Sequence, residues 1–118
     1  MRSYIVERSY GSVKVFYIDR ERLINDLKKW AEKVSKLFNV SEIILFGSIA
    51  KGNATPGSDA DVLIVVERGN KEKVWKKAYS LWSGFPMDLF VVKKGEENTI
   101  VDEADRYGMT LYEKEIPE

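Results

Sequence analysis

Two stretches of sequence decide the fold, IILFGS at residues 43–48 and DADVLIVV at residues 59–66. Each contains a short, continuous apolar run, which is typical of a strand covered on both faces of a sheet. Gly and Pro punctuate the segment between them, which is therefore expected to be a loop. Gly47 and Ser48 thus stand at the carboxyl end of one buried strand, and two aspartates stand at the start of the next.

The sequence on either side predicts strands and helices in alternation. Period-two patterning predicts two N-terminal strands with a turn at Tyr10-Gly11, and apolar residues at three- and four-residue steps predict helices. The expected elements are strands over 3–8 and 12–18, a helix over 20–38, strands over 43–46 and 62–66, a helix over 71–82, a strand over 87–92, a helix over 96–107 and a strand over 109–112. This order predicts a small α/β (α+β) fold, a mixed β-sheet flanked by helices with an N-terminal β-hairpin.

Local signals sharpen several of these elements. Asp19 is expected to cap the first helix and Asn39 to follow its end. In the second helix we expect an inward face and an outward lysine face, the latter solvated rather than bound to nucleic acid. The inward residues are Val74, Ala78 and Leu81, and the outward ones Lys73, Lys76 and Lys77. The three tryptophans, at 30, 75 and 82, are expected to pack in the core or an interface.

Composition restricts the chemistry. The chain of 118 residues fits a single domain over 1–118, and its 19 basic and 19 acidic residues give no overall basic field for a long polyanion. With no Cys and no His, thiolate nucleophiles, thiolate metal sites and histidine bases are excluded. The first residues lack the apolar segment of a signal peptide and no apolar run is long enough for a bilayer, so a cytoplasmic location is expected.

Three aspartates suggest a metal site. Asp59 and Asp61 are two apart, so in a strand their side chains project to the same side. Asp88 is the only charged residue between Leu81 and Val92, so it is expected to be a buried carboxylate that needs compensation. Clustered carboxylates repel each other unless a cation offsets them, and Mg²⁺ prefers such oxygen ligands.

Gly47 and Ser48 suggest a phosphate site beside those carboxylates. Gly47 has no Cβ, so a phosphate can approach the backbone, and Ser48 offers an N–H and a hydroxyl at the start of a short helix. Neither the G-x-x-x-x-G-K-[ST] sequence of a P-loop nor the G-x-G-x-x-G dinucleotide fingerprint occurs, so both of those interpretations are set aside.

Taken together, the motif closely resembles that of a known superfamily. Phe46-Gly47-Ser48, ten intervening residues, Asp59-Ala60-Asp61 and a later Asp88 are similar to the signature of the DNA polymerase β-type nucleotidyltransferases. The run from Gly47 to Gly52 and the short chain resemble the minimal nucleotidyltransferase (MNT) branch.

The resemblance implies a polymerase-β-like fold and a Mg²⁺-dependent transfer of NMP from ATP or another NTP. It implies two Mg²⁺ ions on Asp59, Asp61 and Asp88, phosphates on Gly47 and Ser48, and Asp88 assisting deprotonation of the acceptor. Lys51 stands where many relatives have Arg, so a phosphate contact there would be a point charge rather than a planar fork. Minimal members are often paired with a small helical HEPN toxin, and the resemblance implies an antitoxin that transfers AMP to that partner.

Two other functions remain open on the sequence. A nucleotide-sensing or partner-masking subunit could keep the fold with negligible turnover. A transferase with a small hydroxyl acceptor would share every motif above and differ only in what it modifies.

Overall fold

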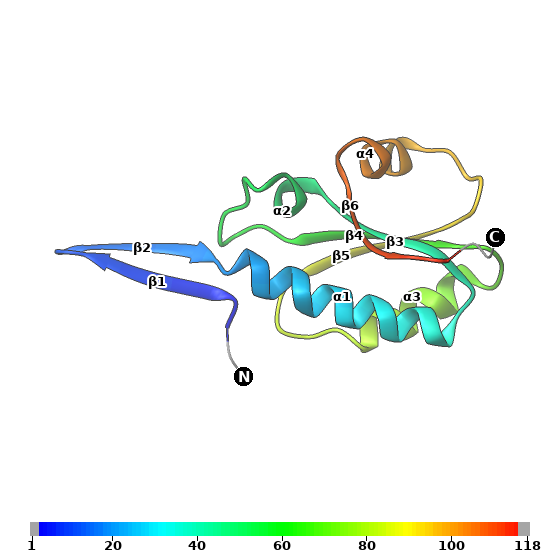
Figure 1. Ribbon diagram of the computed structural model, residues 1–118, viewed down its shortest axis with the longest axis horizontal. Coiled ribbons are helices and arrows are strands. Elements are labelled where there is room, and N and C mark those ends of the chain that lie inside the picture. The colour runs from blue at the N-terminus through cyan, green and yellow to red at the C-terminus, as the bar shows by residue number, and fades with distance from the viewer. Residues whose placement is uncertain (1–2, 116–118) are drawn as a thin grey trace.

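A computed structural model describes residues 3–115, and Figure 1 shows its helices and strands. The elements are β1 (Ile5–Tyr10), β2 (Val13–Ile18), α1 (Arg20–Leu37), β3 (Val40–Phe46), α2 (Gly47–Lys51), β4 (Ala60–Val66), α3 (Lys71–Ser80), β5 (Met87–Lys93), α4 (Thr99–Tyr107) and β6 (Met109–Glu113). The expected α+β class, its mixed sheet and its N-terminal hairpin are confirmed. Within residues 3–115, no helix has the length and apolarity needed to cross a bilayer.

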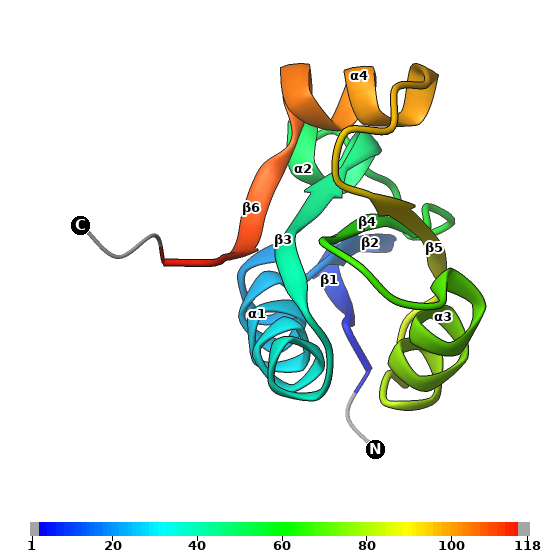
Figure 2. The same cartoon turned by 90° about the vertical axis from the view of Figure 1, so that its right-hand side faces the viewer.

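The main sheet has four strands in the order β5-β4-β3-β6. Strand β3 is antiparallel to β4 and to β6, whereas β4 and β5 are parallel. Helices cover both faces: α1 and α3 lie on one side of the sheet, and α2 and α4 lie on the other (Figure 2). The strand β5, which carries Asp88, is therefore at an edge of the sheet.

Side chains of the central strands fill a core on each face, as expected for strands covered twice. Toward α1 and α3 the buried residues include Ile43 and Leu45 of β3, and toward α4 they include Ile44 and Phe46. The continuous apolar run of β3 follows from this double burial, because neither face of the strand meets water.

The hairpin forms a separate two-stranded sheet that projects from the body (Figure 1). The chain measures 55 × 30 × 29 Å along its principal axes, the long one being extended by this arm. The turn is Gly11-Ser12 rather than Tyr10-Gly11, and the strands span 5–10 and 13–18. Gly11, at the first central position of the turn, has a positive φ as in a type II′ turn, and this sets the register.

Helix ends agree with the local signals, with three corrections. One is that α4 begins at Thr99, after the cap residue Asn98, rather than at residue 96. The Asp19 side chain accepts a hydrogen bond from the Arg22 N–H and caps α1, which ends at Leu37 because Phe38 is already extended. Leu81 was expected to face inward and this was wrong. It follows the last residue of α3 and is 37% exposed.

Candidate active site

The candidate site lies where β3 ends and where β4 and β5 begin. In the sheet register Phe46 pairs with Asp61, and Asp61 pairs with Asp88. Directly paired residues place their side chains on the same face, so both carboxylates lie on the face that α2 and α4 cover. The register thus brings together two aspartates that are far apart in the chain.

The exposed position of Asp88 corrects the expectation that it is buried. Its neighbours Met87 and Leu89 are buried because they point toward the opposite core. On the Asp88 face, apolar residues of α4 pack against Phe90 and Val92, farther along the strand. Asp88 therefore sits at the uncovered start of an edge strand, where it is open to solvent.

Gly47 lies directly against the carboxylate of Asp61. Its φ is +74°, and a Cβ placed on it would lie 2.2 Å from Oδ2 of Asp61. Residues that carry a side chain rarely adopt such a backbone conformation. The same Cβ would lie 3.1 Å from Cγ of Asp61. The absence of a side chain at Gly47 is thus what lets the first turn of α2 approach the aspartate.

Electrostatic repulsion is concentrated at Asp61. Burial raises the pKa of Asp61, and the carboxylates of Asp88, Asp59 and Glu103 raise it further. A half-buried carboxylate that is repelled by the charges of other acids is costly when ionised, and a divalent cation would offset that cost. The donor set therefore fits a hard metal ion.

Asp59 stands apart from the other two aspartates. It is exposed and precedes the first residue of β4, so no strand pairing fixes its side chain. Between Ser3 and Glu115, no three acidic side chains converge into a ready metal-binding group. Asp61 and Asp88 are paired by the sheet, and Asp59 acts on Asp61 through its charge.

Lys51, at the last position of α2, is held by residues of α4. Its Nζ lies 3.8 Å from Oε1 of Glu103 and 4.9 Å from the ring centroid of Tyr107. Because Glu103 and Tyr107 are four apart in a helix, they share one face of α4. The only charge-bearing residue of α2 thus contacts two residues of α4.

Arg20, the first residue of α1, also holds helix α2 through hydrogen bonds. The Arg20 side chain donates from Nε to the carbonyl of Ile49 at 2.8 Å and from Nη2 to that of Ala50 at 3.1 Å. At the other end, no side chain caps the first turn of α2. Its leading N–H groups, near Ser48, are therefore available to an anion.

A separate hollow of about 280 Å³ lies between α4 and the other end of the sheet. Its lining includes Glu42, Lys93, Lys94 and Asp105. Burial, followed by the charges of Asp105 and Glu113, raises the pKa of Glu42. None of the expected site residues lines this hollow.

Residues 27–115 match the family described as "Nucleotidyltransferase domain". The chain belongs to this family, and it is therefore a nucleotidyltransferase. The match covers the four-stranded sheet and all of its flanking helices except the first turns of α1. The superfamily resemblance of the sequence motif is confirmed.

Similar proteins extend this assignment. The chain is 32% identical over 97 residues to the Methanocaldococcus jannaschii protein named "Putative protein adenylyltransferase MJ0141", covering 75% of this chain and 98% of that one. A "putative nucleotidyltransferase" structure from Sulfolobus solfataricus has a TM-score of 0.63 at 24% identity. The match covers 80% of this chain and 84% of that one. A structure of a tri-AMPylated Shewanella oneidensis HEPN toxin in complex with MNT antitoxin has a TM-score of 0.51 at 16% identity. The match covers 80% of this chain and 73% of the matched chain. The last two likenesses show the shared fold.

Sequence reasoning missed Glu103, Tyr107 and Arg20. The spacing of Glu103 and Tyr107 places them on one face of a helix, but nothing local shows that this face meets Lys51. Arg20 immediately follows a cap residue, and its bonds to α2 depend on how α1 packs. All three residues contact partners that are far away in the sequence, and a periodic pattern within one element does not predict such contacts.

Proposed function

We propose that the protein is a Mg²⁺-dependent nucleotidyltransferase that moves AMP from ATP to a hydroxyl of a partner protein. The partner we propose is a small helical HEPN-type toxin, with this chain as its antitoxin. The observation that carries the proposal is the contact of Gly47 with Asp61, which is itself paired with Asp88. This contact places a backbone segment that a phosphate can approach next to the pair Asp61 and Asp88, which can bind metal. Both features belong to a chain of the nucleotidyltransferase family.

The chain's own residues divide the work. Asp59, Asp61 and Asp88 would hold Mg²⁺, as two ions, while Gly47 and Ser48 donate to the triphosphate and Lys51 adds a positive charge. When bound, the metal would neutralise phosphate charge and orient the reacting oxygens. Asp88, exposed at the sheet edge, would accept the proton of the attacking hydroxyl.

Transfer balances without any other cofactor. The acceptor oxygen forms a bond to the α-phosphorus, the bond from that phosphorus to the α,β-bridging oxygen breaks, and pyrophosphate leaves with the electron pair. No histidine is needed, and the chain has none. The name of the Methanocaldococcus jannaschii relative supports a protein acceptor, and the Shewanella oneidensis complex supports a HEPN-type one.

The test is a labelling reaction with ATP labelled at the α-phosphate, Mg²⁺ and a small helical HEPN-type protein as the acceptor. We expect label on that protein with the wild type and none with Asp61→Asn. The matched control is Asp102→Asn, an exposed carboxylate in the first turn of α4 that should label like the wild type. No label on the partner with any of the four NTPs would refute the proposal. Label on a small hydroxyl compound alone would show that the acceptor is a small molecule and not a protein.

A further inference from the structure

The N-terminal hairpin has one side on which nearly all residues are apolar and one side on which apolar and polar residues are mixed. The register of β1 and β2 places three rows of paired residues on the first side, and we call it the arm face. The arm face consists of Val6 with Tyr17, Arg8 with Val15, and Tyr10 with Val13. The opposite side carries the ion pair of Glu7 and Lys14, at 3.4 Å, together with Ser9 and Phe16. At the root of the hairpin it also carries Ile5 and Ile18, which pack against the core.

The arm face is exposed toward its tip. Tyr10 is 61% exposed, Val13 57% and Val15 43%. β-Branched and aromatic side chains in strands are usually at least partly covered. An isolated two-stranded hairpin is marginally stable in water because no second layer covers its apolar side. Three of the four exposed large apolar residues of the hairpin lie on this face, and such a group marks an interaction surface rather than scattered surface positions.

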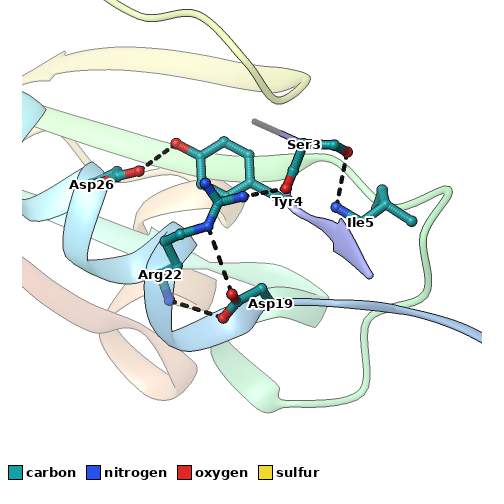
Figure 3. Close-up of polar contacts among 6 residues, drawn as sticks. All are labelled: Ser3, Tyr4, Ile5, Asp19, Arg22 and Asp26. Atoms are coloured by element: carbon teal, nitrogen blue, oxygen red, sulfur yellow. Dashed lines mark hydrogen bonds and ion pairs between the residues drawn. The ribbon is translucent and has the colours of Figure 1, made fainter. Parts of the chain in front are cut away.

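The root of the hairpin is fixed to the body, so the arm has a defined direction (Figure 3). The Tyr4 hydroxyl donates to Asp26 at 2.6 Å, and the Arg22 guanidinium lies 4.2 Å from the Tyr4 ring centroid. The Asp19 N–H donates to the Tyr4 carbonyl at 2.7 Å, closing the base of the hairpin. Burial of Tyr4 and its bond to Asp26 raise the pKa of Tyr4 to about 12.

The arm projects outward from the end of the molecule where the candidate site lies (Figure 1). The hairpin leaves the body at the end of the sheet where α2 and the loop before β4 lie (Figure 1). Arg20, next to the end of β2, donates hydrogen bonds to carbonyls of α2. Tyr17 and Ile18 line a hollow of about 120 Å³ together with Ile49 and Gly52. A protein that presents a hydroxyl near Asp88 therefore approaches the end of the molecule from which the arm projects.

A single cation interrupts the arm face. The Arg8 guanidinium lies 5.4 Å from the Tyr17 ring centroid, and contacts with Tyr10 and Tyr17 raise the pKa of Arg8. Among residues 3–115 no carboxylate forms an ion pair with Arg8. A partner that covers this face must therefore supply an acceptor for Arg8, since an unpaired charge is costly once it is desolvated.

We propose that the arm face docks the acceptor protein, which meets it with an apolar ridge that carries a carboxylate for Arg8. This rests on the proposed function, because it concerns the protein that receives AMP. A second copy of this chain fits less well, since two arm faces would bring two arginines into one apolar contact. Six side chains are also far fewer than the roughly 20 residues per side of a stable interface, so the docked protein must extend beyond the arm toward the site.

The test compares two hairpin variants that remove exposed apolar side chains from opposite faces. The first is the triple variant Tyr10→Ser with Val13→Thr and Val15→Thr, and the matched control is Phe16→Ser, whose side chain is 53% exposed on the side opposite the arm face. The probe is the HEPN-type protein used as acceptor in the labelling reaction, and its Kd for the full chain is measured by titration calorimetry. Steady-state transfer gives KM for the same protein.

We expect the triple variant to raise Kd and KM by roughly tenfold or more with kcat retained, and Phe16→Ser to change them less than about threefold. Arg8→Glu is expected to raise Kd by a similar factor and keeps the test decisive if the triple variant unfolds. Wild-type Kd values for the triple variant and for Arg8→Glu would overturn the inference, and so would the absence of binding by the wild-type chain. A dimer of the chain alone that the triple variant dissociates in sedimentation would assign the face to a second copy and also overturn it.

The two proposals fail in different ways. Binding that depends on the arm face without any label on the partner would refute the transfer reaction and leave the docking surface intact. Label on the partner with equal Kd in all variants would retain the transfer reaction and refute the docking surface.

Discussion

Replacing Gly47 by alanine tests the geometry of the site most sharply, because a second glycine provides a matched control. Gly47 and Gly52 both have left-handed backbones, with φ of +74° and +80°. A Cβ on Gly52 would meet nothing within 4 Å, whereas a Cβ on Gly47 would lie 2.2 Å from Oδ2 of Asp61. The two substitutions thus share backbone strain and differ in whether they displace a carboxylate.

The magnitudes follow from these contacts. Alanine in the left-handed conformation costs roughly 1–2 kcal/mol, so both variants are expected to lose about that much stability. In Gly47→Ala the carboxylate oxygen must also retreat by about 1 Å to reach an ordinary contact distance, and a shift of that size can lower catalysis about 100-fold. The aspartate is short, so its rotation costs less in stability than in activity.

The assay has two parts. Urea unfolding followed by tryptophan fluorescence gives the free energy of unfolding, and AMP transfer or metal-dependent nucleotide binding gives function. We expect Gly52→Ala to retain activity within a fewfold, while Gly47→Ala loses about 100-fold at similar stability. Equal activity in the two variants would show that the contact between Gly47 and Asp61 has no role, and the site would have to be built differently.

Three other outcomes are expected. Without metal, Asp61→Asn should raise the free energy of unfolding at pH 7, because the folded-state pKa is raised above its ordinary 3.8 and wild-type stability is lost as pH rises above that value. A gain in urea midpoint that is no larger at pH 7 than at pH 4 would contradict this. Glu103→Gln should change the free energy of unfolding by only about 0.5 kcal/mol, since ion pairs of half-exposed groups contribute little. The same substitution should lower KM for ATP by freeing Lys51, and an unchanged KM would refute the competition. Tyr4→Phe should destabilise the protein at pH 8 through its lost bond to Asp26. The raised pKa of about 12 makes the wild-type contribution fully present below pH 10 and lost as pH rises toward 12. The difference between the two proteins should therefore shrink by about 2 kcal/mol over that range. A constant difference in urea midpoint would show that the hydroxyl is not held as described.

Local sequence predicted most of the fold because most elements depend on local chemistry. The Asp19 cap, the apolar face of α1 and the doubly buried β3 each follow from signals within a few residues. The hairpin was also predicted, although its turn lies one residue later. Its register depends on the positive φ of Gly11, which chain periodicity does not specify.

The sequence names the candidate residues of the site but only part of their geometry. Pairing of Asp61 with Asp88 agrees with the motif, but the exposure of Asp88 depends on β5 being an edge strand. Strand order is a tertiary property, and flanking apolar residues look the same in a central strand. The pairing of Glu103 with Lys51 likewise depends on how α4 packs over the sheet.

The most direct test of the central claim is a crystal structure of the full chain with Mg²⁺ and a non-hydrolysable ATP analogue. We predict Mg²⁺ on Asp61 and Asp88, with Asp59 drawn in, and the phosphates against Gly47 and Ser48. Nucleotide bound instead in the hollow that Glu42 and Lys93 line, at the other end of the sheet, would contradict the account.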